Sequence, residues 1–342
     1  NNRLDSLSKF YENKYNTHEF NVSLRTIREK YQYNIGFSVQ PQESTTSYEQ
    51  GTIKVDTTRN VVNFSPTFDY RYRFNKQSML RINYRGRTSQ PSMTDLLPIT
   101  DTSDPLNISK GNPSLKPSYT NSFMLFYNTF LPEKQQSMMA RLTFSNTINS
   151  VSNTVTYDEE TGARITQPKN INGNWSASGG FVFNTPLKNK KFTVSTFSDG
   201  SYNNMVGFTS LSGQTDSQKN TTRSLNLSER LNGTFRNDWF EFGLNGGIRY
   251  NVSKSTLQPQ SDKETFDYSF GASSNVTLPW DVTVSTDASY SMKRGYSEGL
   301  DRNELIWNAQ IAKNFLKKKQ ATISLQIYDI LKEQSNLSRS IS

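Results

Sequence analysis

Five arginines stand where their side chains could hold an anion together. In an extended chain, residues two apart share a face. The arginines keep this spacing in two neighbouring stretches and alternate with residues such as Tyr70, Tyr72 and Ile82. They are Arg71, Arg73, Arg81, Arg85 and Arg87, called here the basic wall. This wall could attract a negatively charged substrate, or its charges could pair with nearby carboxylates, because buried charge requires partners.

Acidic residues offer weaker chemistry. The acidic run at 158–160 could ligate Ca²⁺ through its oxygens, but its place in a polar connection favours a solvated hairpin tip. Asp101 and Asp104 carry a similar weak indication of a cation site. The only histidine, His18, stands alone near a predicted strand start, which favours a plain surface role.

The composition leaves little room for catalysis or cofactors. The 342 residues include no cysteine and one histidine. Nucleophile–base pairs and triads therefore lack their usual parts, disulfides are impossible, and His-based zinc sites are incomplete. Glycoside chemistry needs a pair of carboxylates, and no pair stands out. We predict a protein that is not an enzyme and has no cofactor.

The elements that position these residues are long two-faced strands. From 240 to 252, every second residue is apolar or glycine, and charged residues fall only on the other face. Residues 265–278 repeat the pattern. A side-chain period of two indicates a β-strand. These runs of about 12 to 15 residues exceed the usual strand length of about 5 to 6, and their succession is typical of a transmembrane β-barrel.

Scoring this period along the chain predicts about 14 strands. They span 18–27, 31–40, 61–74, 78–87, 119–130, 138–149, 172–185, 191–203, 222–236, 239–253, 264–279, 281–292, 302–315 and 320–331. Residues 1–16 form a polar lead-in, and long connections at 41–60, 88–118, 150–171, 204–221, 254–263 and 293–301 alternate strictly with short turns. An up-and-down barrel sorts its connections in this way, with short turns at the periplasmic rim. A soluble Greek-key sandwich has no reason to do so.

Aromatic residues mark both ends of the predicted strands. Those that we assign to a membrane-interface girdle beside the short turns are Phe74, Phe130, Trp239, Phe240, Trp280 and Phe315. A second set stands at the other strand ends: Tyr84, Tyr119, Trp175, Tyr202, Tyr250, Phe266, Tyr290 and Trp307. The band between them is roughly 9 to 11 residues, which at a tilt of ~40° spans about 25 Å, the height of an outer-membrane apolar band. We therefore predict an all-β, transmembrane, up-and-down antiparallel β-barrel in contact with outer-membrane lipid, whose basic wall faces the lumen.

The connection at 88–118 has an unusual composition. Its five prolines restrict the backbone, which predicts a stiff loop that leads into the strand at Tyr119. It contains the pattern QPS, then LP, DP and GNPxLKP. The matching residues are Gln90, Pro91, Ser92, Leu97, Pro98, Asp104, Pro105, Gly111, Asn112, Pro113, Leu115, Lys116 and Pro117.

With Tyr84, Arg85 and Arg87 before it, this pattern resembles the barrel of TonB-dependent outer-membrane receptors, especially their outer-membrane β-barrel subfamily. Weaker matches are YDEETG from 157, NINGNW from 170, WNAQIAKNF from 307 and YDIL from 328. The resemblance implies import of a scarce, large ligand such as a siderophore or other nutrient. It also implies a plug domain in the same full-length chain, a TonB-type energiser, and a barrel of about 22 strands. Because neither plug, TonB segment nor closing strand is found here, residues 1–342 are expected to form a single partial barrel domain.

Two other interpretations stay open. One is a passive porin or structural barrel, and the other is a soluble all-β binding or adhesion module. Nucleic acid is not expected as a partner, although the net charge is +9, because lysines are spread over turns such as 188–191 and 316–319 and form no single stripe. The expected location is the outer membrane of a Gram-negative bacterium, and the small-molecule ligand is not identified by the sequence.

Overall fold

The computed structural model describes residues 9–211, 214–296, 301–315 and 320–334. Its fifteen-stranded main sheet contains β1 (Lys9–Thr17), β2 (Phe20–Ile27), β3 (Tyr31–Gln50), β4 (Ile53–Arg73), β5 (Ser78–Ser89), β8 (Ser118–Leu131), β9 (Gln136–Ile148), β12 (Asn174–Pro186), β13 (Phe192–Thr209), β14 (Gln218–Arg236), β15 (Phe240–Ser255), β16 (Lys263–Leu278), β17 (Val282–Arg294), β18 (Arg302–Phe315) and β19 (Ala321–Ile327). The outer sheet contains β6 (Thr100–Asp101), β7 (Asn107–Lys110), β10 (Ser150–Tyr157) and β11 (Arg164–Ile171). The short helices are α1 (Met93–Leu96), η1 (Pro259–Ser261) and η2 (Pro279–Asp281).

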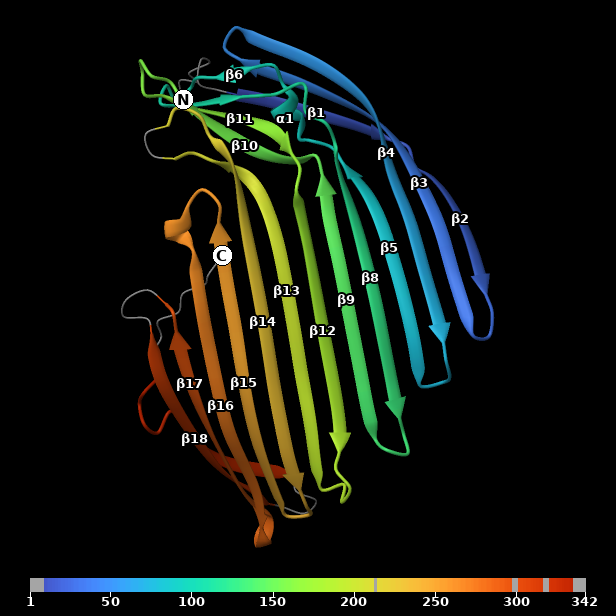
Figure 1. Cartoon of the computed structure of the whole chain (residues 1–342), viewed down its shortest axis with the longest axis vertical. Coiled ribbons are helices and arrows are strands. Elements are labelled where there is room, and N and C mark those ends of the chain that lie inside the picture. The colour runs from blue at the N-terminus through green and yellow to red at the C-terminus, as the bar shows by residue number, and fades with distance from the viewer. Residues whose placement is uncertain (1–8, 212–213, 297–300, 316–319, 335–342) are drawn as a thin grey trace.

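The main sheet is antiparallel and follows chain order, so each strand pairs with its neighbours in an up-and-down arrangement. Each of the fourteen predicted strands corresponds to one strand of this sheet, and the prediction of an all-β up-and-down fold is confirmed. The short turns lie together at one end, while the outer sheet and α1 lie at the other (Figure 1). The predicted turn at 316–319 lies outside the described residues.

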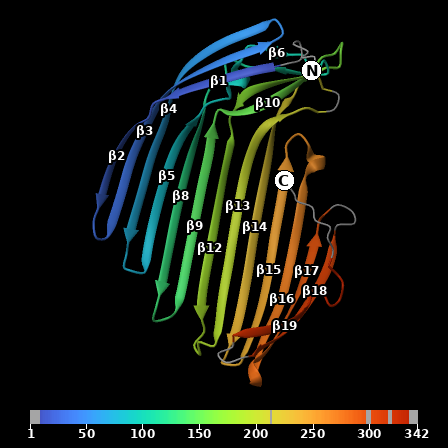
Figure 2. The ribbon, with the colours of Figure 1, turned by 180° about the vertical axis from the view of Figure 1, so that it is seen from behind.

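The main sheet is curved but open. Among the described residues, the outer edges of β2 and β19 have no pairing partner. These two strands lie far apart in both views (Figures 1 and 2). The described strands therefore form part of a barrel wall and not a closed barrel.

The predicted connection at 41–60 is wrong. β3 and β4 continue as paired strands to Gln50 and Ile53 and join in a tight turn at Gly51, where φ is +56°. Strict alternation of short and long connections therefore fails here. The reason is that this half of the hairpin is mostly polar on both faces, so apolar alternation gives little signal, although its threonines favour an extended chain.

The polar lead-in is also a strand from Lys9 onward. β1 and β2 both pair with β3 in one register, since Thr17 lies opposite Gln42 and Phe20 opposite Val39. Between them His18 donates its backbone N–H to the Pro41 carbonyl at 3.0 Å. Because Pro41 has no N–H to return, the ladder is interrupted at this point. β1 and β2 thus act as one long edge strand.

Two further predicted connections, 88–118 and 150–171, contain the strands of the outer sheet and are therefore not irregular loops. Residues 150–171 contain the β10–β11 hairpin, and the loop at 88–118 contains α1, β6 and β7. The strand order is β10-β11-β7-β6, with β11 and β7 parallel. Most fully buried residues lie at this end, including Tyr48, Leu97 and the cluster of Met93, Leu96 and Leu115. Within the described residues, no helix has the length and apolar character needed to cross a membrane.

Candidate functional site

The main sheet has one apolar and one polar face. On the apolar face, aromatic rings contact each other across five adjacent strands, with centroid distances from 4.7 to 6.3 Å. This row runs through Tyr84, Phe123, Phe144, Trp175 and Tyr202. Large apolar side chains below it, such as Leu142 and Leu231, are more than half exposed. Such a surface fits contact with lipid, bounded by an aromatic belt.

The residues of the predicted girdle lie at the short-turn end. Phe74, Phe240 and Phe315 fall on the apolar face, while Trp239 and Trp280 stand in or beside turns and are 60% and 82% exposed. Phe130 requires a correction. It pairs with Ser137 and shares the polar face with Asn128. The prediction was wrong because it used the position of Phe130 along the strand and did not ask which face of the strand the residue occupies.

All five arginines of the basic wall share the polar face, since Arg71 pairs with Arg81 and Arg85 with Thr67. They do not form one uniform wall. Arg81 donates from Nε and Nη2 to Asp69 Oδ2 at 2.8 and 2.5 Å. Arg71 and Arg73 line a small cleft beside the turn at 28–30.

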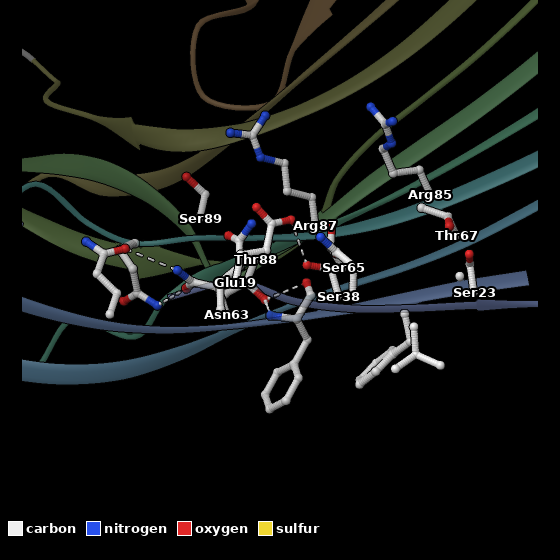
Figure 3. Close-up of a pocket in the computed structure, with 18 of the residues that line it drawn as sticks. Glu19, Ser23, Ser38, Asn63, Ser65, Thr67, Arg85, Arg87, Thr88 and Ser89 are labelled. Carbon is white, nitrogen blue, oxygen red and sulfur yellow. Dashed lines mark hydrogen bonds between the residues drawn. The ribbon is translucent and has the colours of Figure 1, made fainter. Parts of the chain in front are cut away.

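Arg85 and Arg87 instead line a polar cavity of about 590 Å³. Both side chains extend on the same side of the sheet (Figure 3). Among the described residues, neither has an ion-pair partner. These two guanidinium groups are therefore the part of the basic wall that could bind an anion.

The cavity exists because β4 and β5 separate after the Thr67–Arg85 pair. Pro66 cannot donate a ladder hydrogen bond. Gly86 leaves space for Tyr119, since a Cβ on this glycine would stand 2.0 Å from the Tyr119 hydroxyl. Thr88 then bridges the gap with its side chain, which accepts from the Phe64 N–H at 3.0 Å and donates to the Phe64 carbonyl at 3.1 Å.

Amides and a carboxylate complete the lining. Gln90 donates to Asn63 at 2.6 Å, and Asn63 donates to Gln42 at 3.2 Å, so three amides from three segments form a chain. The Oε1 atom of Gln90 is buried without a partner among the described residues. Glu19 accepts from Ser38 Oγ at 3.1 Å and stands in the same cavity (Figure 3). The site thus offers two cations, one anion and many neutral donors and acceptors.

The loop motif is mainly structural. Gly111 packs so closely that a Cβ would stand 1.9 Å from the Leu97 carbonyl oxygen. Asn112 donates to the Pro168 carbonyl at 2.9 Å, and the Lys116 backbone is bonded in both directions by the Asn170 amide, at 2.8 and 2.9 Å. The motif therefore locks the loop at 88–118 onto β11.

Other motif residues shape the same loop. Ser92 caps α1 by accepting from the Asp95 N–H at 3.1 Å, Leu97 is 0% exposed, and Leu115 is 2% exposed. Asp104 accepts from the Leu106 N–H and the Asn107 amide, at 3.0 and 2.8 Å. Of the prolines of the motif, Pro105 and Pro113 stand in turns, and the others stand in irregular segments between elements: Pro91, Pro98 and Pro117. Of the whole motif, only Gln90 lines the cavity.

The acidic candidates have local partners. Asp158 forms the predicted hairpin tip between β10 and β11, where its Oδ1 accepts from the Glu160 and Thr161 N–H groups and the Thr161 hydroxyl, at 2.8 to 3.1 Å. Those hydrogen bonds, chiefly from Thr161, lower the pKa of Asp158. Asp101 pairs with Lys9. In the part of the chain that the structure describes, no three acidic or histidine side chains are arranged to hold a metal ion.

A second polar cavity of about 710 Å³ lies at the outer sheet. Its lining includes Asn112, Asn170 and Lys169, and the Lys169 Nζ atom lies 5.9 Å from the ring centroid of Phe208. Sequence reasoning missed this cavity and the role of Glu19, since both depend on contacts between distant segments. The period-two pattern did carry a signal for Arg85 and Arg87.

The long antiparallel strands, the belted apolar face and the polar inner face together define a membrane β-barrel wall. A sequence model of the outer membrane protein beta-barrel family matches residues 2–239 and 214–342. The chain belongs to this family and is an outer-membrane protein. Comparison with curated proteins and with solved structures gave no significant match.

Proposed function

We propose that this chain forms part of the wall of a TonB-dependent transporter in the outer membrane of a Gram-negative bacterium. The transporter imports a scarce, large ligand with energy supplied through a TonB-type partner, and a plug domain of the same full-length chain fills its lumen. The barrel performs no covalent chemistry and needs no cofactor. The motif resemblance from 84 to 117 supports this assignment within the family.

The open sheet supports a barrel larger than the described strands. Unpaired backbone groups at a strand edge find no water in hydrocarbon. The edges of β2 and β19 therefore require further strands in the membrane. Barrels of about 22 strands enclose a plugged lumen, whereas smaller ones conduct passively or are filled by side chains.

The observation that carries the proposal is the polar cavity with Arg85 and Arg87. A passive pore needs no built cavity in its wall. Here two arginines, which have no carboxylate partner among the described residues, stand beside six amide side chains and several hydroxyls. Such a site fits contact with an anionic ligand rich in oxygen atoms.

The first test is the conductance of the full-length protein in a planar lipid bilayer. We expect no steady open-pore current, because the plug closes the lumen. A stable aqueous pore would contradict the proposal and leave a passive porin.

The second test is uptake in intact cells with a panel of anionic ferric chelates. We expect uptake that stops when a protonophore collapses the inner-membrane potential. The double substitution Arg85→Gln and Arg87→Gln should lower uptake at least about tenfold, since a lost charged hydrogen bond costs about 1.5–3 kcal/mol. Arg141→Gln on the same face of β9 is the matched control and should change nothing. A closed pore without uptake of any chelate would exclude this ligand class but not a plugged transporter.

A further inference from the structure

The apolar face carries one carboxylate between its aromatic rows. Glu229 of β14 shares this face with Leu227 and Leu231, and it pairs with Ile248 on the next strand. Glu264 of β16 is on the same face but lies towards the outer end, where it accepts from the Tyr250 hydroxyl at 2.9 Å. Between the rows, Glu229 is the only acidic side chain of the described residues.

Other charges on this face lie towards its ends. Arg223, six residues from Glu229 on β14, pairs with Lys254 towards the outer end. Lys313 pairs with Val282 beside a short turn, where its amine reaches the headgroups. Glu229 stands near the middle of the apolar band.

A hollow adjoins this carboxylate. Gly179 of β12 lies directly opposite Gly200 of β13, so two neighbouring strands lack side chains on the apolar face at one level. Leu142 and Leu227 border the hollow, and a Cβ on either glycine would stand 3.0 to 3.1 Å from their methyl groups. The hollow measures about 650 Å³, and Glu229 is part of its lining.

Hydrocarbon cannot satisfy Glu229. Thr196 donates its hydroxyl to one carboxyl oxygen, and this is its one hydrogen bond from the described residues. A carboxylate has room for about four such bonds, and lipid tails donate none. Because an ionisable group without hydrogen-bond partners is costly in the bilayer, its presence there indicates a functional position with a polar partner.

The surface around Glu229 is self-complementary. Relative to Glu229, Gly179 lies two strands away on β12 and two residues nearer the outer end of the sheet. The ring of Phe270 is 51% exposed and lies two strands from Glu229 on the other side, on β16. Phe270 is two residues nearer the short turns than Glu229. Barrel strands tilt by about 35–45° from the membrane normal. A line of constant depth in the membrane therefore moves towards the short turns from one strand to the next along the chain, as the aromatic rows do. Gly179 and Phe270 consequently lie at a similar depth in the membrane. A hollow and a ridge therefore flank Glu229 at one level.

We propose that this face binds a second copy of the chain about a two-fold axis parallel to the membrane normal, with Glu229 at the axis. The Phe270 ring of each copy then enters the Gly179–Gly200 hollow of the other, as an isologous contact requires. The two Glu229 carboxyl groups meet at this axis, so that each copy supplies the polar partner that lipid lacks. This inference does not depend on the transported ligand.

Crosslinking tests the axis directly. The sequence has no cysteine, so Glu229→Cys in the full-length protein introduces a thiol without a native competitor. Oxidation in native membranes should give a disulfide-linked homodimer, since the paired Cα atoms must lie within about 7 Å. Phe123→Cys on the same face of β8 should stay monomeric. Dimers of the Phe123 variant and none of the Glu229 variant would overturn the proposal.

A larger side chain in the hollow tests whether the Phe270 ring of the second copy enters it. Gly179→Leu should raise the dimer dissociation constant at least tenfold in lipid nanodiscs. Ala309→Leu is the control, because Ala309 lies on the same face of β18, four strands from Glu229. A wild-type protein that is monomeric in nanodiscs would refute the proposal, and an equal loss in both variants would also refute it.

A charge swap separates a second copy from other occupants. Glu229→Lys alone should not dimerise, whereas differently tagged wild-type and Glu229→Lys chains should pair with each other in preference to themselves. Heat-modifiable migration shows whether the variant folds. Photo-crosslinking from Ile248 to lipid or to an unrelated membrane protein, with no self-adduct, would identify the wrong occupant and overturn the proposal.

Discussion

Gly111 shows how one residue fixes a long loop. Its N–H bonds to the Ile99 carbonyl at 3.1 Å, and the missing Cβ lets it lie against the Leu97 backbone. The neighbouring Asn112 then reaches the Pro168 carbonyl. The motif in this loop therefore reflects packing between two loops, and the residues that could contact a ligand lie mostly outside it.

Gly111→Ala should loosen the loop. The added methyl group meets backbone atoms that cannot move independently, and overpacking of this kind costs about 1–3 kcal/mol. We expect faster proteolysis within 93–117 and a lower unfolding temperature. Gly233→Ala has open space and serves as the control. Equal protease resistance of both variants would contradict the packing argument.

Asp101 gives a pH prediction outside the membrane. Burial raises the pKa of its carboxyl group, but hydrogen bonds from Lys9 and Ser103 outweigh this and lower the pKa from 3.8 to about 2. Because the folded pKa is lowered, this group stabilises the fold above about pH 4, and the contribution is lost as the pH falls through 2. The change corresponds to about 2 kcal/mol at about 1.36 kcal/mol per pH unit.

Asp101→Asn should therefore lower the free energy of unfolding by about 2 kcal/mol at pH 7, and the difference should vanish near pH 2. Urea unfolding followed by tryptophan fluorescence measures this. Asp238→Asn, in the turn at 237–239, is the control. A stability difference that persists unchanged at pH 2 would exclude the Lys9 contact as its cause.

At the scale of elements, strands with one apolar face could be predicted from the sequence. β14 to β18 were found almost to the residue at several ends, because lipid contact imposes a strict alternation. The upper halves of β3 and β4, and all of β10 and β11, carry few apolar residues and therefore gave too weak an alternation to be recognised as strands. Their pairing partners decide their structure, and pairing cannot be deduced from a local pattern.

The candidate site likewise has one part that could be predicted from the sequence and one part that could not. Arg85 and Arg87 share a face through simple parity, so their common orientation could be predicted. The cavity itself depends on the separation of β4 from β5, which needs Pro66, Gly86 and the distant Tyr119 together. Glu19 joins it only because β2 pairs with β3. Contacts of this kind appear only in the folded chain.

A spin-label scan of β16 tests the two faces. Nitroxides at even positions from 266 to 278 should be accessible to oxygen in lipid, and those at odd positions to a water-soluble nickel relaxant. The period of two follows from the pairing of β16 with β15 and β17. A label at Phe130 should behave like the polar face. A period of 3.6, or no period, would contradict the strand assignment.

At the scale of the whole molecule, the open edges limit independent folding. Residues 1–342 expressed alone should not give a heat-modifiable, detergent-resistant band, because β2 and β19 expose unpaired backbone groups to lipid. The full-length protein should give such a band. A stable, monomeric membrane protein formed by residues 1–342 would show that these edges find partners within this segment.

The parallel pairing of β7 with β11 joins two connections that lie far apart in the sequence, 88–118 and 150–171. Loops on the cell surface meet phages and antibodies, and they commonly escape by gaining or losing residues. Here the hydrogen bonds from Asn112 and Asn170 hold both loops in one register. An insertion in either loop would have to be matched by a change in the other, so natural variants of this surface should change length in pairs.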